Sequence, residues 1–177
     1  MRKVKEIVFV LLTVGIILTL SACAGSKDYV ISGNDTIGYI YDYDKNVDED
    51  VIAATVLERH LPEMSGEVAF ARVMILGEAD GKTYTLNTYI DYNFDGNEIN
   101  SIPQYIELGI FDDISDVDYT SVDETEVYMN YVKYVPEEIA ETYFSGYAAN
   151  FNTVTYLWKQ LKEEMDADAE RYFGLEE

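Results

Sequence analysis

Two long strand-like stretches around residues 67–94 constrain the fold of this chain more than any other feature. Glu67 to Leu76 (EVAFARVMIL) is apolar at most positions, which indicates a central strand covered on both faces. Asp80-Gly81 follows, and this dipeptide is typical of a tight hairpin turn. Thr83 to Phe94 then alternates, and we expect one of its faces to be core, namely Tyr84, Leu86, Thr88, Ile90, Tyr92 and Phe94. The sequence therefore predicts an antiparallel hairpin at the centre of the domain.

Shorter periodic segments surround this hairpin. Alternation predicts further strands, and spacings of three and four predict helices. The strands are expected at 36–43, 99–111 (broken near Pro103) and 127–135, and the helices at 50–61, from 136 onward and at 153–173. The predicted fold class is α+β: a single domain with an antiparallel meander of about four to five strands, one N-terminal-side helix and C-terminal helices. This order resembles cystatin-like and NTF2-like folds, a resemblance of fold that implies no function.

Three single residues stand out within these elements. His60, the only histidine of the sequence, lies on the apolar stripe of the first helix, which favours a hydrogen-bonded histidine at the edge of the core over a catalyst. Arg72 interrupts the central strand and is expected to pair with a carboxylate at the sheet rim, with ligand binding as the alternative. Trp158, the only tryptophan, lies on the stripe of the last helix and is expected to pack in the core.

Composition limits the classes of function. The chain has 12 basic and 34 acidic residues, a net charge of −22, so nucleic acid is not expected as a partner. A single cysteine cannot form a disulfide within the domain. The sequence shows no nucleophile elbow, phosphate-binding loop or zinc spacing, and we therefore predict no enzymatic activity.

Asp91 to Asn97 (DYNFDGN) is the most suggestive stretch for metal chemistry. It resembles the opening of an EF-hand or dockerin calcium loop, which implies Ca²⁺ ligands at Asp91, Asn93 and Asp95 and a sharp turn at Gly96. The closing carboxylate expected at the twelfth position is replaced by Ile102. The alternative is a second β-hairpin that turns at Asp95-Gly96-Asn97; apart from Ca²⁺, no cofactor is expected.

A dense acidic run without any basic residue follows the meander. Such runs are usually solvated loops, but this density also makes the run the best candidate for a surface that meets a cationic protein. Its carboxylates are Asp112, Asp113, Asp116, Asp118, Asp123, Glu124 and Glu126.

The N-terminus has the layout of a secretory leader. A basic head precedes fourteen mostly apolar residues, Ile7 to Leu20, a run too short to span a bilayer comfortably. Leu20-Ser21-Ala22-Cys23 resembles the lipobox of bacterial lipoproteins, which implies cleavage before Cys23 and a diacylglyceryl thioether on its sulfur. We expect a signal peptide at 1–22, a lipidated cysteine and tether at 23–35, and an acidic domain at 36–177. Cleavage would change the net charge from −22 to −24.

These observations predict a lipid-anchored lipoprotein on the extracytoplasmic face of a bacterial cell membrane. Its expected role is non-catalytic binding, foremost of another protein through the acidic surface. One version is an immunity or inhibitor protein against a cationic toxin or hydrolase. The alternatives are binding of calcium or a small ligand, and contact with envelope glycans through some of the sixteen tyrosines.

Overall fold

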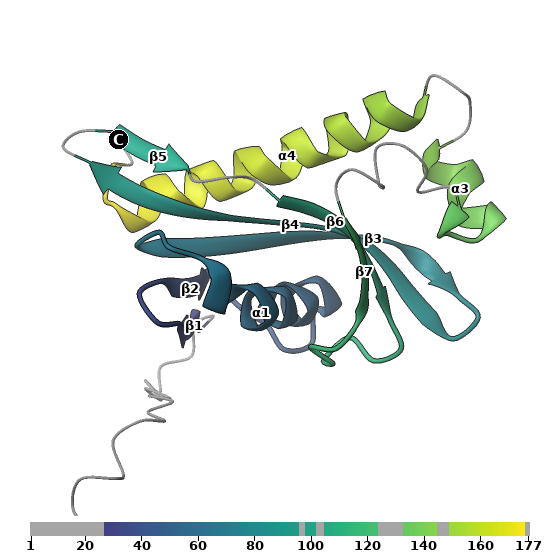
Figure 1. Ribbon diagram of the computed structural model, residues 1–177, viewed down its shortest axis with the longest axis horizontal. Helices are drawn as coiled ribbons and strands as arrows, with labels where there is room; N and C mark the ends of the chain where they lie inside the picture. Colours follow the sequence, from purple (N-terminus) through teal and green to yellow (C-terminus); the bar gives the residue numbers. More distant parts are fainter. Residues whose placement is uncertain (1–26, 96–97, 102–104, 124–132, 145–148, 176–177) are drawn as a thin grey trace, which may run out of the picture.

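A seven-stranded β-sheet separates two helical layers in the computed structural model, which describes residues 27–95, 98–101, 105–123, 133–144 and 149–175 (Figure 1). The strands are β1 (Tyr29–Ser32), β2 (Ile37–Ile40), β3 (Val68–Ala79), β4 (Lys82–Asp95), β5 (Glu98–Ser101), β6 (Tyr105–Phe111) and β7 (Thr120–Asp123). The helices are α1 (Asp48–His60), the 3₁₀ turn η1 (Leu61–Glu63), α3 (Glu137–Phe144) and α4 (Ala149–Tyr172). Helix α1 covers one face of the sheet, and α3 and α4 cover the other. The α+β class is confirmed.

The sheet is mixed rather than wholly antiparallel. Its strand order is β1-β2-β3-β4-β6-β7, and β5 pairs with β4 beside β6. The pairs from β3 to β7 are antiparallel, as the predicted meander requires, but β2 pairs with β3 in parallel. Parallel neighbours need a crossover connection, and α1 supplies it between β2 and β3. The prediction missed this because it expected a strand at 36–43 before α1 but assigned that strand no partner in the sheet.

The central hairpin forms as the sequence predicts. Ala79 pairs with Lys82 across a two-residue turn in which Asp80 has φ 52° and Gly81 has φ 73°. Positive φ at both central residues defines the type of turn that Asp-Gly favours. The second hairpin, β4–β5, is also confirmed, with Asp95 opposite Glu98.

Both faces of β4 are buried over residues 84–92, which corrects the prediction of a single core face. Phe94, expected on that core face, is 36% exposed. On the α4 face Ile90 and Tyr92 pack with Met165, as expected. The opposite face, which was not assigned to the core, carries Thr85, Asn87, Tyr89 and Asp91, each at most 9% exposed. Helix α1 covers this face, and its residues 52–57 are all buried. A helix that is mostly apolar around its circumference is stable only when other elements cover it, and the sheet supplies this cover.

Contacts of the C-terminal helix confirm two single-residue predictions. Arg72 on β3 forms an ion pair with Asp168 on α4, and its Nε atom lies 3.4 Å from Oε2 of Glu164. Trp158 packs against the cluster that contains Leu86 and Ile139. In the described part of the chain no helix is both long and apolar enough to cross a membrane.

Two local predictions need correction. The expected tether at 23–35 contains β1, which pairs with β2, so part of this segment belongs to the sheet. Within the expected strand at 127–135, residues 133–135 form a turn before α3, and 127–132 lie outside the described residues.

Candidate functional site

A buried carboxylate organises the α1 face of the sheet. Glu107 on β6 is 4% exposed, and its Oε1 atom accepts hydrogen bonds from Tyr119 Oη and, at 3.0 Å, from Asn87 Nδ2. Its Oε2 atom lies 3.3 Å from Nε2 of His60. His60 is therefore a partnered histidine at the edge of the core, as predicted. Elements α1, β4, β6 and the segment before β7 all contribute to this network.

Close packing fixes the position of Asn87. Thr85 Oγ1 donates a hydrogen bond of 2.7 Å to Asn87 Oδ1, which directs the amide nitrogen toward Glu107. Gly109 lies opposite Thr85 on β6, where a Cβ atom would come within 2.6 Å of Asn87 Nδ2. A larger residue at position 109 would displace the amide, so the glycine keeps room for the network.

Tyr119 is held from three sides. Its ring stacks on Phe111 with centroids 4.1 Å apart, and the Arg59 guanidinium lies 4.3 Å from the centroid of the Tyr119 ring. Arg59 also donates a hydrogen bond to the Tyr119 carbonyl oxygen. These contacts hold the phenol hydroxyl beside Glu107, to which it donates a hydrogen bond, and 3.4 Å from His60 Nε2.

The network determines the ionisation of its members. Burial alone would raise the pKa of Glu107, but hydrogen bonds from His60 and Tyr119, the charge of His60 and the bond from Asn87 together lower it. Burial and the neighbouring Glu107 charge raise the pKa of Tyr119 far above its usual range. Near neutral pH the site therefore contains a carboxylate and a protonated phenol.

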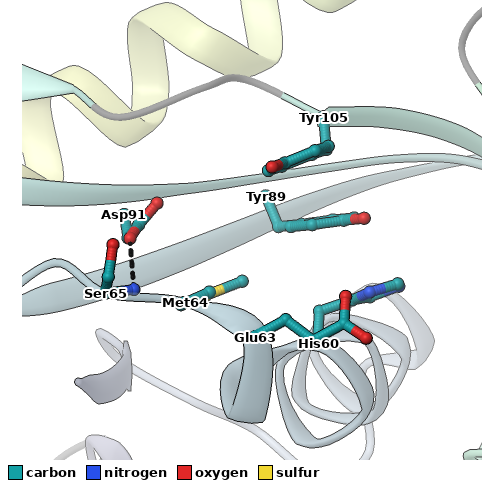
Figure 2. A pocket seen from close by; sticks show the side chains of 7 residues that line it. All are labelled: His60, Glu63, Met64, Ser65, Tyr89, Asp91 and Tyr105. Atoms are coloured by element: carbon teal, nitrogen blue, oxygen red, sulfur yellow. Dashed lines mark hydrogen bonds between the residues drawn. The ribbon is translucent and has the colours of Figure 1, made fainter. Parts of the chain in front are cut away.

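A small pocket opens beside this network (Figure 2). Three rings are layered along it: His60 and Tyr89 are nearly parallel with centroids 4.0 Å apart, and Tyr89 stacks on Tyr105 at 5.1 Å. The cavity volume is about 140 Å³. Its lining residues are His60, Glu63, Met64, Ser65, Tyr89, Asp91 and Tyr105. The pocket thus combines aromatic edges and hydroxyls with carboxylates.

The three residues proposed as calcium ligands lie along an extended strand. Asp91 is buried, and its Oδ2 atom accepts hydrogen bonds from the amides of Ser65 at 2.9 Å and Gly66 at 2.7 Å. Asn93 Oδ1 accepts a hydrogen bond from the Glu67 amide, and Asp95 is exposed in the β4–β5 hairpin. Among the described residues no group of three or more histidine, cysteine or acidic side chains is placed to hold a metal ion. Asp91 also lines the pocket.

The acidic run follows β6 and is exposed at Asp112, Asp113, Asp116 and Asp118. Asp113 and Asp116 accept hydrogen bonds from the amides two residues further on, and Asp112 lies 2.9 Å from Lys82 Nζ. The hydrogen bonds that Asp113 accepts from the Ser115 amide and hydroxyl lower the pKa of Asp113. Asp123 ends β7; Glu124, Glu126 and Cys23 lie outside the described residues.

Sequence reasoning did not find the buried network. Asn87 and Tyr89 fall on the polar face of an alternating strand, which usually faces solvent, and Glu107 and Tyr119 belong to no motif. The run at 51–57 (VIAATVL), apolar at every position except Thr55, was the available indication that a helix would cover that face.

Comparison with known proteins adds no relative: no family model, curated protein or solved structure matches this chain.

Proposed function

We propose that this protein is a lipid-anchored bacterial lipoprotein that binds another protein at the extracytoplasmic face of the cell membrane, without catalysis. The observation that carries the proposal is the stretch Leu20 to Cys23, which follows a basic head and an apolar run and stands directly before the folded domain. Acyl chains on Cys23 would anchor a domain whose own negative charge gives it no affinity for anionic membranes.

The start of the ordered domain supports a position close to the bilayer. Asp28 is already fixed, since its carboxylate accepts hydrogen bonds from Tyr39 Oη at 2.6 Å and from the Asp42 amide at 3.1 Å. Asp28 lies five positions after Cys23, with four residues between them, so the connection reaches about 18 Å at most. A partner of this domain would accordingly be a membrane-proximal or envelope protein.

An acidic surface on the α1 side supports protein binding. Ile114 packs against the α1 core, and its carbonyl oxygen accepts a 3.0 Å hydrogen bond from Thr55 Oγ1 on that helix. The exposed acidic run at 112–118 thereby lies against α1, whose first turn carries Asp48, Glu49 and Asp50. Carboxylates from two distant segments thus belong to one side of the domain, which favours a cationic partner.

Cell fractionation with Cys23→Ser tests the anchor. The wild-type chain should sediment with membranes and incorporate labelled fatty acid, and Cys23→Ser should lose the label and the cleavage. The matched control is Ser21→Ala, which keeps a small residue before the cysteine and should remain anchored. Fatty-acid labelling that survives in Cys23→Ser, or an unlabelled wild-type protein, would overturn the proposed anchor.

Crosslinking on living cells tests the binding surface. The variant Asp113→Asn/Asp116→Asn/Asp118→Asn removes three charges while asparagine can still make the local turns, and it should reduce crosslinked partner severalfold. The control Glu137→Gln/Glu138→Gln/Glu141→Gln removes the same number of exposed charges from α3 and should leave the yield unchanged. Equal losses in both variants, or an association rate insensitive to salt, would contradict binding through this surface.

A further inference from the structure

We propose that the pocket beside His60, Tyr89 and Tyr105 binds the ammonium or guanidinium group of a basic side chain on the protein's partner. This inference rests on the proposed function, because it names the chemical group through which a cationic partner would insert into the domain. The proposal follows from unpartnered polar atoms in the pocket, from the charge of its lining and from its size.

Two deeply buried residues offer unused hydrogen-bonding capacity to the pocket. Tyr89 is 9% exposed, and its hydroxyl has no hydrogen-bond partner among the residues that the structure describes. Asp91 is 3% exposed; its Oδ2 atom accepts two backbone hydrogen bonds, whereas Oδ1 accepts none from the described part of the chain (Figure 2). Neither oxygen is enclosed: among the described residues, the enclosed side-chain atoms without a partner are Thr155 Oγ1 and Trp158 Nε1. Both oxygens are therefore open to accept hydrogen bonds from a ligand in the pocket.

The charge of the lining selects a cation. Glu63 is exposed at the pocket, and within the described residues its carboxylate has no ion-pair or hydrogen-bond partner. Asp91 adds a second carboxylate, and Glu107 is placed behind His60. An anionic ligand would be repelled by these groups. A primary ammonium has three hydrogen-bond donors and a guanidinium has five, so either group can bond to several of the oxygens that line the pocket.

The ring geometry determines how the cation would be held. Both faces of Tyr89 are covered, one by His60 and the other by Tyr105, so a ligand in the pocket meets ring edges and hydroxyl groups (Figure 2). Binding over the face of Tyr89 is therefore blocked, and hydrogen bonds to oxygen take the place of a cation–π contact. Burial together with the charges of Glu107 and Glu63 raises the pKa of Tyr89 well above its usual range, which keeps the hydroxyl protonated beside the ligand.

The size of the pocket limits the ligand to one head group. Its volume of about 140 Å³ is close to the roughly 150 Å³ of a cavity that takes up a benzene-sized molecule. Sites for larger organic ligands usually measure about 300–1,000 Å³. A lysine or arginine side chain that enters from a partner surface fits this volume, because only its terminal group needs to be enclosed.

Nuclear magnetic resonance titration of the full-length chain in detergent micelles, at constant ionic strength, tests the proposal. The probes are Nα-acetyl-lysine methylamide and Nα-acetyl-arginine methylamide, and the neutral control is Nα-acetyl-norleucine methylamide. At least one basic probe should cause saturable shifts at Tyr89 and Asp91, and the neutral analogue should cause none. Equal binding of the neutral analogue, or no saturable shift with either basic probe, would overturn the proposal.

Two conservative variants localise the probe. Glu63→Gln and Tyr89→Phe should each weaken binding about tenfold, the effect of losing one charge-assisted hydrogen bond. Neither group has a partner in the described structure, so folding should be retained. The matched control Glu141→Gln, an exposed carboxylate on α3, should bind as the wild type does. Unchanged affinity in both pocket variants would contradict this site.

Further comparisons distinguish a free amine from a partner side chain as the ligand, and distinguish failure of the pocket proposal from failure of the proposed function. If free 1,4-diaminobutane binds more than tenfold tighter than either side-chain probe, the pocket serves small free amines and the partner side chain is excluded. The variant Asp113→Asn/Asp116→Asn/Asp118→Asn should lose crosslinked partner but retain probe binding. Crosslinking without probe binding would refute only the proposed ligand of the pocket. Probe binding without any crosslinked partner would refute the proposed function.

Discussion

The imidazole ring of His60 lies nearly parallel to the phenol ring of Tyr89, with centroids 4.0 Å apart, while its Nε2 atom faces the buried carboxylate of Glu107. One side chain thus joins the pocket wall to the buried polar network. The consequence is that single polar atoms on this face should influence the stability of the whole domain.

Replacing Tyr119 with phenylalanine should lower the free energy of unfolding by about 1.5–3 kcal/mol, because a buried carboxylate loses a hydrogen-bond donor. Urea denaturation measures the change. Tyr105→Phe is the matched control: Tyr105 is 46% exposed, and the change should stay within about 0.5 kcal/mol. Equal stability of Tyr119→Phe and wild type would show that the hydrogen bond to Glu107 contributes nothing.

The lowered pKa of Glu107 predicts a specific acid sensitivity. Because the folded-state pKa lies below the ordinary value of 4.5, the ionised carboxylate stabilises the fold above pH 4.5, and this contribution is lost as the pH falls through the folded-state pKa. Unfolding free energies of wild type and Glu107→Gln should therefore differ most above pH 4.5 and converge below it. A difference that stays constant from pH 6 to pH 3 would contradict the assignment.

Removing one partner of the Arg72–Asp168 ion pair should lower the free energy of unfolding more than replacing both partners with apolar residues. Burial outweighs the nearby Arg72 and Arg171 charges and raises the pKa of Asp168, which shows that its ionisation is costly in the folded state. Asp168→Ala should cost about 2 kcal/mol, and Arg72→Met/Asp168→Leu should recover most of this loss. Lys159→Ala breaks the exposed pair with Glu163 and should cost less than about 0.5 kcal/mol. A double variant no more stable than Asp168→Ala would contradict this account.

Met165 should be a principal contact of α4 with the sheet. Its side chain is fully buried in the cluster that contains Phe70, so Met165→Ala should reduce the unfolding free energy by about 2–5 kcal/mol. Tyr156→Ala on the same helix provides the comparison, because Tyr156 is 62% exposed and its replacement should change stability by about 0.5 kcal/mol or less. Calorimetry of both variants decides whether α4 is docked as described.

The candidate site was only partly accessible to sequence reasoning. Asp91 was singled out as a candidate calcium ligand, since its neighbours resemble a calcium loop, and that assignment stays a prediction. The structure adds that Asp91 accepts hydrogen bonds from the amides of Ser65 and Gly66 and lines the pocket. His60 was correctly expected to have a partner, yet no pattern named Glu107 as that partner. Tyr89 lies on the face that was not assigned to the core, because alternation alone does not reveal whether a second layer covers that face.

The sequence by itself determined the β3–β4 hairpin, the approximate extents of α1 and α4, and the acidic character of the chain. The hairpin and the helices depend on turn chemistry and on periodicity within short segments, which neighbouring residues specify. The acidic character follows directly from the composition. Only the tertiary structure decided the parallel pairing of β2 with β3, the burial of both faces of β4 and the meeting of His60, Asn87, Glu107 and Tyr119. These features depend on contacts between residues far apart in the chain. Such contacts stabilise the fold only when α1 is packed on the sheet.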